Sequence, residues 1–302
     1  MALPGKPRVL ITGAGGFTGR HLSHHLMQKG WDVLGLDRSS PASAPLTEAV
    51  DILDTAALAA LLRRWAPSHV VHLAGLAHVV GDPMDFFRVN VLGTESLMEA
   101  VAASGLQLQK MVVASSANVY GNARHSPVSE DEPLSPMNHY ALSKVAMELM
   151  LRQWQDRWPL VLTRPFNYTG PGQSERFLFP KLVQAFVRRD PVIRLGNLDV
   201  ARDLSDVRFV CEAYARLLRE PQAEGVFNLC SGQSLHLQAA LDGLTALTGH
   251  RPRIEVDPAL VRRNEIKEMC GQPQRLFEAV GPIAVIAPLD IFRHMLEHQA
   301  AA

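Results

Sequence analysis

The feature that most constrains the fold is a glycine-rich segment close to the start of the chain. An apolar run, residues 9–12, leads into Gly13, Gly16 and Gly19 at three-residue intervals, and a helical pattern follows. Glycine suits such a strand-to-helix turn because a Cβ atom would hold the backbone N–H groups and the helix N-terminus away from a bound pyrophosphate. The segment therefore predicts a dinucleotide-binding turn. Its predicted contacts are Gly13, Gly16, Phe17, Thr18 and Gly19.

An acidic residue stands where the second strand of such a unit ends. Asp37 follows the glycines by about twenty residues, the position from which a carboxylate accepts a hydrogen bond from a ribose 2′-hydroxyl. Asp37 therefore favours NAD(H). Arg38 beside it could pair with a 2′-phosphate, so the sequence leaves NADP(H) open.

Short β-branched runs alternate with longer helical patterns along most of the chain. This alternation is the sequence form of repeated βαβ units and predicts a doubly wound α/β fold around a parallel sheet. The predicted strands are 8–12, 32–36, 69–73, 110–115, 160–163 and 226–230, and the clearest helices are 20–29, 84–103, 140–158 and 203–219.

A turn-rich segment, Arg164 to Gly172, and a higher frequency of proline beyond it indicate a smaller C-terminal lobe. We expect residues 1–164 to form a Rossmann dinucleotide-binding domain and residues 165–302 to form mainly a substrate-binding lobe. We expect the residues from about 203 to 232 to return to the first domain.

Two further motifs supply acid–base chemistry. Tyr140 and Lys144 are one helical turn apart, and a cation beside a phenol is expected to lower the phenol pKa from about 10. Ser116 follows the strand predicted at 110–115, at the carboxyl edge where open α/β sheets bind ligands. A hydroxyl there could hydrogen-bond a reacting oxygen and orient it toward the phenol. Ser116, Tyr140 and Lys144 are therefore the predicted catalytic residues.

These motifs resemble those of the extended short-chain dehydrogenases/reductases, specifically the nucleotide-sugar epimerase/dehydratase family. The resemblance spans nearly the whole chain and includes Asp51-Ile52, His72-Leu-Ala-Gly75 and the turn Arg164-Pro-Phe-Asn-Tyr-Thr-Gly-Pro-Gly172. It implies further cofactor contacts at Asp51, Ile52, Leu73, Ala74, Gly75, Asn90, Ser115, Tyr140, Lys144 and Pro165. It implies substrate contacts at His78, Ser116, Asn118, Asn167, Arg202 and Arg262.

Three reactions share this scaffold, and the residues after Ser116 argue against one of them. The family's 4,6-dehydratases place acidic residues there, whereas this chain has Ala117 and Asn118, neither of which transfers a proton at neutral pH. Reduction of a 4-keto sugar and 4-epimerisation stay open. Several segments resemble reductases of GDP-linked 4-keto-6-deoxy sugars, which favours NAD(P)H-dependent reduction over NAD-dependent epimerisation. A catalytically inactive dinucleotide sensor is disfavoured because all three catalytic residues are present.

The composition argues against nucleic-acid-binding, membrane and secreted proteins. Lys and Arg equal Asp and Glu at 30 each, without a long run of one sign, so we expect no nucleic-acid or membrane partner. The three cysteines fit a reducing compartment, and no metal site, secretory signal or membrane span is indicated, so we expect a cytoplasmic protein. The resemblance further implies a homodimer formed through the helices predicted at 84–103 and 140–158.

Overall fold

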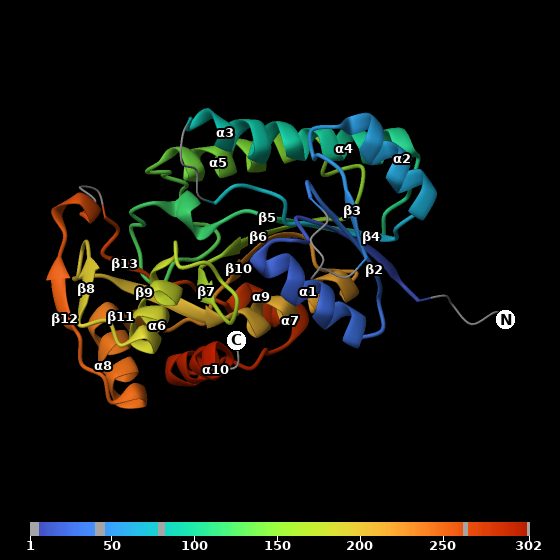
Figure 1. The fold of residues 1–302 in the computed structure, drawn as a ribbon. Coiled ribbons are helices and arrows are strands. Elements are labelled where there is room, and N and C mark those ends of the chain that lie inside the picture. Colours follow the sequence, from blue (N-terminus) through green and yellow to red (C-terminus); the bar gives the residue numbers. More distant parts are fainter. Residues whose placement is uncertain (1–5, 40–45, 78–81, 262–264, 301–302) are drawn as a thin grey trace.

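The computed structural model describes residues 6–39, 46–77, 82–261 and 265–300. Its largest element is a seven-stranded sheet, in which every neighbouring pair is parallel and the strand order is β10-β6-β5-β4-β1-β2-β3 (Figure 1). The strands are β1 (Arg8–Thr12), β2 (Asp32–Asp37), β3 (Thr47–Ala49), β4 (His69–His72), β5 (Lys110–Ala114), β6 (Leu160–Pro165) and β10 (Gly225–Leu229). The predicted doubly wound parallel sheet is confirmed. The six predicted strands are all present with ends shifted by at most two residues, and the short edge strand β3 was not predicted.

Helices cover both faces of this sheet (Figure 1). One face packs against α1 (Phe17–Gln28), α7 (Val207–Arg219) and α9 (Gln274–Val280), and the other against α2 (Thr55–Trp65), α4 (Gly93–Ser104) and α5 (His139–Leu151). Side chains alternate along each strand, so Val9 and Ile11 enter the first core whereas Leu10 enters the second. The sheet is apolar on both sides, as the near-continuous apolar runs of its central strands require.

Three predicted helices were wrong in extent. The helix predicted at 84–103 consists of α3 (Met84–Phe87), a π-helical turn (Arg88–Leu92) and α4. The helix predicted at 140–158 is α5, which ends at Leu151, and residues before Pro159 form turns because proline disfavours helical backbone in the residue before it. The segment predicted as helix at 203–219 begins as strand β9 (Ala201–Asp206), and Asp206 then caps α7 by accepting a hydrogen bond from the Arg208 N–H.

The later residues build a second, smaller unit beside the carboxyl edge of the sheet. Strand β9 pairs with β7 (Asn167–Thr169), β11 (Ser234–His236) and β13 (Glu268–Met269), and β8 (Val192–Leu195) pairs with β12 (Arg253–Val256). Its core lies among α6 (Leu178–Arg188), α8 (Leu237–Thr248) and α10 (Pro288–Ala300). Helix α7 packs against α1, and β10 rejoins the central sheet after the first strands of this unit.

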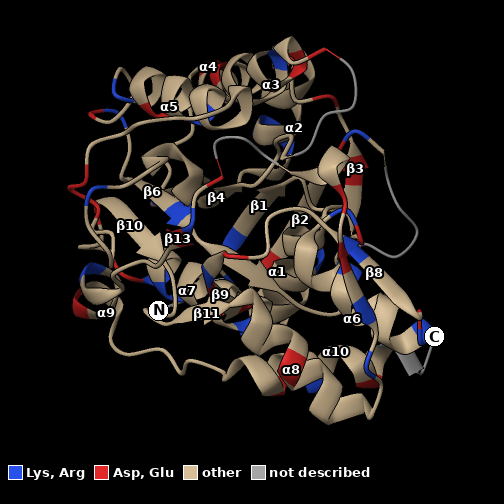
Figure 2. Cartoon of the chain, turned by 90° about the vertical axis from the view of Figure 1, so that its left-hand side faces the viewer, with Lys and Arg blue, Asp and Glu red and all other residues tan. Residues whose placement is uncertain are grey.

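Three further features of the described residues concern helix hydropathy, the cysteines and the distribution of charge. No described helix has the length and apolar character that crossing a bilayer requires. Cys211, Cys230 and Cys270 are free thiols in the interior. Basic and acidic residues are intermixed along the described elements in Figure 2.

Candidate active site

The predicted site residues gather at one edge of the central sheet. Strands β1, β4 and β5 are neighbours and parallel, so the segments that follow them, which contain Gly13, Gly75 and Ser116, lie at the same carboxyl edge. The chain order of the sheet reverses between β1 and β4, and open α/β sheets bind ligands in the crevice at such a point.

The glycine-rich turn is packed too tightly for side chains. Gly13 has φ +70°, and a Cβ atom there would lie 2.7 Å from the Ala74 nitrogen. A Cβ atom at Gly19 would lie 2.3 Å from the Gly13 oxygen. Gly16 precedes α1, no side chain caps that helix, and its first turn carries no acidic residue. The turn therefore fits the pyrophosphate of a dinucleotide, which would accept hydrogen bonds from the first N–H groups of α1.

Asp37 is fixed beside this turn. Its Oδ2 accepts a hydrogen bond from the Gly15 N–H at 2.9 Å, and its Oδ1 accepts one from the Arg38 N–H at 2.8 Å. Asp37 is half-buried and the Arg38 side chain is exposed. Further along, the exposed Asp51 accepts a hydrogen bond from the Leu53 N–H, and the buried Ile52 packs against Gly93.

Helix α5 carries two of the three predicted catalytic residues. Asn138 caps the helix by accepting a hydrogen bond from the Ala141 N–H at 2.8 Å. The buried Lys144 Nζ donates to the Ala114 carbonyl at the end of β5, at 2.8 Å. A Cβ atom at Gly75 would lie 3.3 Å from Lys144 Nζ, which places the segment after β4 against the lysine.

Ser116 begins a 3₁₀ turn (Ala117–Tyr120) directly after β5. Its Oγ accepts hydrogen bonds from the Asn118 backbone N–H at 3.2 Å and from the Asn118 side chain at 3.0 Å. The Ser116 side chain also acts on the Tyr140 phenol, whose pKa it lowers. The fold thus brings Ser116, Tyr140 and Lys144 together from β5 and α5.

The expected lowering of the tyrosine pKa was wrong. Burial raises the pKa of Tyr140 above 10, and the Ser116 side chain opposes this rise only in part. The Lys144 ammonium is committed to the Ala114 carbonyl, and burial lowers the pKa of Lys144 to about 8 against the opposing charge of Glu148. The phenol is therefore protonated at neutral pH, the form that donates a proton to an oxygen.

A buried hydrogen-bond chain links β1 to the catalytic helix through His72. Thr94 Oγ1 donates to the Asn90 carbonyl at 2.7 Å, so it accepts from His72 Nε2 at 2.8 Å. Burial lowers the pKa of His72 to about 3, so the ring is neutral, and its Nδ1 accepts from Thr12 Oγ1 at 2.7 Å. The geometry therefore assigns the Nε2–H tautomer to His72.

The chain continues from Asn90 to α5. In the π-helical turn, the Asn90 amide donates to the Leu76 carbonyl at 3.1 Å and to Ser143 Oγ at 3.0 Å, and its Oδ1 accepts from the Leu76 N–H at 2.7 Å. Ser143 Oγ then donates to the Tyr140 carbonyl at 2.7 Å. Asn90 therefore fixes the segment that includes Leu73, Ala74 and Gly75 relative to the catalytic helix.

His72 predicts acid sensitivity of folding. Its pKa is about 3 in the folded protein and about 6.5 in the unfolded chain, so the unfolded chain binds more protons between these values. The free energy of unfolding should then fall as pH drops below 6.5, by about 1.4 kcal/mol per pH unit from this residue. Urea unfolding at pH 7 and pH 5 measures it. His72→Asn should weaken the dependence of the free energy of unfolding on pH, whereas His298→Asn, at an exposed histidine, should leave that dependence unchanged. An equal dependence on pH in the two variants would contradict the assignment to His72.

The predicted substrate residues lie on the side of the second unit. Asn118 and Asn167 are exposed, and Asn167 pairs with Leu204 of β9. Arg202 on β9 is half-buried and forms an ion pair with Glu265 at 2.6 Å. Pro165 ends β6 one residue after Arg164. His78 and Arg262 lie outside the described residues.

Asp203, next to Arg202 in the sequence, faces the interior. It is fully buried, and its carboxylate accepts hydrogen bonds from the N–H groups of Ser231 and Gly232 at 2.7 and 2.8 Å. The Ser231 hydroxyl donates to the same carboxylate at 2.7 Å. Asp203 therefore fixes the loop after β10 and does not face the site.

The comparison with known proteins places this geometry in a family. Residues 9–230 match the family described as NAD dependent epimerase/dehydratase, about three quarters of the chain. The chain belongs to that family. The predicted fold, the NAD(P) cofactor class and the assignment as a nucleotide-sugar enzyme are thereby confirmed at the level of the family.

Individual relatives of this epimerase/dehydratase span its length. It is 31% identical over 276 residues to GDP-6-deoxy-D-talose 4-dehydrogenase of Aggregatibacter actinomycetemcomitans, covering 91% of each chain. It is 32% identical over 290 residues to GDP-6-deoxy-D-mannose reductase of Pseudomonas aeruginosa, again covering 91% of each. The structure of RMD from Pseudomonas aeruginosa with NADPH superposes with a TM-score of 0.86 at 30% identity, covering 98% of this chain and 99% of the other.

Sequence reasoning missed the contacts between α1 and the turn after β6. Thr18 Oγ1 and the Tyr168 hydroxyl are 2.7 Å apart, and Phe17 stacks on the Tyr168 ring. Arg20 donates to the carbonyls of Gly15 and Gly172, and His21 Nε2 lies 2.9 Å from the Pro171 carbonyl. These contacts join the dinucleotide-binding turn to the predicted substrate turn. No local pattern in the sequence identifies the partner of His21, which is 150 residues away.

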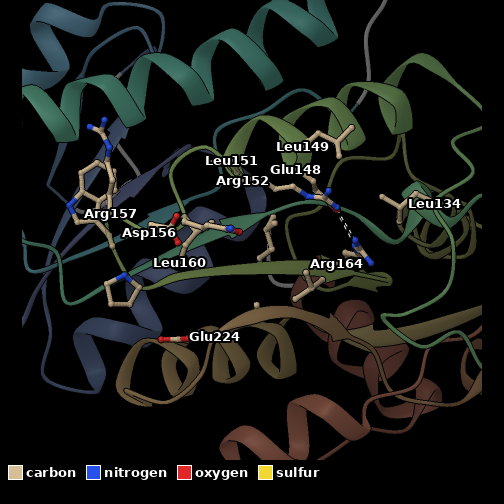
Figure 3. Close-up of a pocket in the computed structure, with 16 residues that line it drawn as sticks. Leu134, Glu148, Leu149, Leu151, Arg152, Asp156, Arg157, Leu160, Arg164 and Glu224 are labelled. Atoms are coloured by element: carbon tan, nitrogen blue, oxygen red, sulfur yellow. Dashed lines mark hydrogen bonds and ion pairs between the residues drawn. The ribbon is translucent and has the colours of Figure 1, made fainter.

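The structure also contains a cavity of about 530 Å³ away from this edge, beside the end of α5 (Figure 3). None of the predicted site residues lines it, whereas the paired side chains of Glu148 and Arg164 do. Glu148 follows Lys144 by four residues and so shares its helix face, a signal that sequence reasoning did not use. No cluster of three potential metal ligands occurs among the described residues.

Proposed function

We propose that this enzyme reduces the C4 ketone of a nucleotide-linked 4-keto-6-deoxyhexose, with a GDP sugar favoured. The observation that carries this proposal is the buried Tyr140 phenol, whose pKa burial raises, on the same edge as Ser116, which is followed by Ala117 and Asn118 in place of acidic residues. Such a site donates a proton to an oxygen but has no acid and base for removal of water. The names of the two relatives that act on GDP-6-deoxy sugars support the choice of substrate.

Each residue of the set has a role in this reaction. The reduced dinucleotide, when bound at the glycine-rich turn, supplies hydride to C4 of the sugar. Tyr140 donates its phenolic proton to the carbonyl oxygen, and Ser116 hydrogen-bonds the same oxygen and orients it. Lys144, next to Gly75, would hold the nicotinamide ribose.

We propose that the second unit binds the nucleotide sugar across the mouth of the site. Asn167 and Arg202 project from the paired strands β7 and β9 and would hold the diphosphate and the nucleotide. Asn118, beside Ser116, would contact the hexose. His78 and Arg262 complete the proposed set, with Arg262 on the diphosphate.

The test is turnover with a defined panel of substrates. Purified enzyme is mixed with GDP-4-keto-6-deoxymannose and NADH or NADPH, and cofactor oxidation is followed by absorbance while NMR identifies the sugar. We expect one dinucleotide oxidised per sugar reduced at C4. No oxidation by either cofactor would contradict the proposal.

A second candidate is 4-epimerisation, favoured by 36% identity over 325 residues to the human UDP-glucose 4-epimerase, covering 92% of each chain. The same Ser116, Tyr140 and Lys144 would serve that reaction. An epimerase would purify with NAD and interconvert UDP- or GDP-hexoses at C4 without net oxidation of added cofactor, so the same assay separates the two.

We propose that Asp37 makes NAD(H) the favoured cofactor. Its carboxylate is fixed by Gly15 and Arg38 N–H groups, in position to accept a ribose 2′-hydroxyl and to repel a 2′-phosphate. Asp37→Ala should shift the ratio of kcat/KM for NADH over NADPH toward NADPH by about tenfold, the effect of roughly 1.4 kcal/mol. Asp156→Ala, at an exposed carboxylate beside the cavity away from the site, is the control. An unchanged ratio in Asp37→Ala would refute the role.

We propose that the protein is a homodimer formed through α4 and α5. Helices α4 and α5 lie side by side (Figure 1), and large apolar side chains are exposed on α5 and on the neighbouring π-helical turn, among them Leu142 and Leu92. Such a face is typical of an interface between copies. Leu142→Glu should reduce the mass measured by light scattering from twice the 33.2 kDa chain to one chain. Leu289→Glu on α10, exposed to the same degree (46% against 45%), should stay dimeric; a wild-type mass of one chain would contradict the dimer.

We also propose a cytoplasmic location. The three buried cysteines are free thiols, as expected of a protein in a reducing compartment.

A further inference from the structure

A buried ion pair lies directly behind the catalytic edge. Arg164 at the end of β6 donates to Glu148 of α5 through two nitrogens, Nε to Oε1 at 3.1 Å and Nη2 to Oε2 at 2.7 Å. The Glu148 and Arg164 side chains are 6% and 7% exposed. Figure 3 shows them directed toward each other across the gap between α5 and β6. A two-pronged contact of this kind fixes orientation as well as distance.

Glu148 is tied to the residues that carry the chemistry. Its Oε1 also accepts a hydrogen bond from the Ser115 hydroxyl, and Ser115 precedes Ser116. One helical turn earlier, Lys144 donates to the carbonyl of Ala114, the residue before Ser115. Two successive turns of α5 are thus bonded to two successive residues of the same strand end. This double attachment fixes both the rotation of α5 and its position along the strand.

Arg164 extends the attachment to the far end of the 3₁₀ turn that begins after Ser116. Its Nη1 donates to the Tyr120 hydroxyl at 3.0 Å and to the Glu130 carbonyl at 3.1 Å. The Tyr120 hydroxyl in turn donates to Asn228 Oδ1 of β10 at 2.7 Å. The pair therefore fixes both ends of the Ser116–Tyr120 segment.

We propose that Glu148 and Arg164 are positioning residues for the reaction, which hold Ser116 and Lys144 in register with Tyr140. This rests on the proposed catalytic roles of those three residues. Neither side chain touches the reacting atoms in this arrangement. Their contribution is to maintain the distance between the hydroxyl on β5 and the phenol and ammonium on α5.

The electrostatic surroundings of Lys144 supply a distinct signature of this role. The titratable groups that face it are Tyr140 and Glu148 on α5 and the neutral His72 on β4, and the β5 partner is the Ala114 carbonyl. Burial lowers the pKa of Lys144 to about 8, and the Glu148 carboxylate raises it against that effect. Removing the carboxylate charge should therefore lower the pKa of Lys144 further.

The test is Glu148→Gln, which keeps the size of the side chain and removes its charge. We expect kcat at saturating substrate to fall about tenfold to a hundredfold, since small displacements of reacting groups have effects of this size. The KM for the sugar should change little, and the alkaline limb of the kcat profile should move to lower pH. Glu212→Gln is the matched control, because Glu212 forms ion pairs on α7 away from the site. It should change neither kcat nor the profile.

A purely structural pair would behave differently. Its loss in Glu148→Gln would lower the folded fraction, and so the apparent kcat, and would leave the pH profile unchanged. That result would overturn the proposal. Turnover of Glu148→Gln within twofold of wild type would overturn it as well. If the single variant does not fold, Glu148→Gln combined with Arg164→Gln removes both buried charges. The double variant should fold and bind NADH yet stay impaired in kcat; full recovery of turnover would overturn the proposal. Failure of the wild-type protein to reduce the keto sugar would count against the proposed function alone. The positioning role would still be tested, because kcat of Glu148→Gln can be compared with that of the wild type in whichever nucleotide-sugar reaction the enzyme catalyses.

Discussion

Replacing Tyr140 with phenylalanine should lower kcat for ketone reduction by a factor of about 10² to 10⁴, the range found for loss of a positioned general acid. The Tyr140 phenol lies on the same helix as Lys144, one turn away, and it is protonated at neutral pH because burial raises its pKa. Phenylalanine keeps the ring and its contact with Phe86 and removes only the proton donor. Steady-state kinetics at saturating cofactor and substrate measures the loss.

The matched control for Tyr140→Phe is Tyr214→Phe. Tyr214 is a buried tyrosine of α7, whose hydroxyl lies 3.0 Å from Thr163 Oγ1 and takes no part in the site. Its loss should cost about 1 kcal/mol of stability, as for one buried hydrogen bond, with kcat unchanged. NADH affinity should stay within a few-fold in both variants. Tyr140→Phe turnover within threefold of wild type would exclude Tyr140 as the acid.

The second large effect is expected from Gly19→Ala. The added methyl would lie 2.3 Å from the Gly13 oxygen and 2.6 Å from the Ala14 Cα, and both atoms belong to the backbone of the phosphate-binding turn. Because backbone cannot rotate aside, α1 must move away from the turn, and its N-terminal N–H groups leave the pyrophosphate position. Affinity for NADH should fall at least about a hundredfold, equivalent to roughly 2.8 kcal/mol. Calorimetric titration measures it.

Gly30→Ala provides the comparison for Gly19→Ala. Gly30 lies after the same helix with φ +84°, and no atom comes within 4 Å of its added Cβ. This variant should lose about 1–2 kcal/mol of stability from the strained backbone and keep its cofactor affinity. Equal NADH affinity in Gly19→Ala and wild type would show that the turn does not hold the pyrophosphate.

The framework of the site was predictable because its signals are local. The glycine spacing indicates a turn whose backbone has no room for Cβ atoms at Gly13 and Gly19, and the apolar runs indicate a sheet buried on both faces. The position of Ser116 followed from the rule that ligands bind at carboxyl ends of parallel strands. Each of these inferences needs only residues close together in the chain.

What could not be predicted depends on contacts between distant residues. Thr18 and Tyr168 are separated by 150 positions, and Glu148 and Arg164 meet only because α5 lies over β6. The same limit explains the wrong expectation for Tyr140. Spacing placed a cation near the phenol, but the pKa depends on burial and on the carbonyl that the lysine already contacts. The sequence around Asp203 likewise does not show that its carboxylate binds the loop after β10.

The most direct test of the central claim is the fate of the transferred hydride. NADH carrying deuterium at the transferred position of nicotinamide C4 is turned over with GDP-4-keto-6-deoxymannose, and the product is analysed by NMR and mass spectrometry. The proposed reductase should place one deuterium at C4 of each sugar formed and oxidise one NADH. Unchanged keto sugar, without deuterium at C4 and without oxidation of NADH, would contradict reduction, and interconversion of UDP- or GDP-hexoses at C4 by the same protein would identify an epimerase.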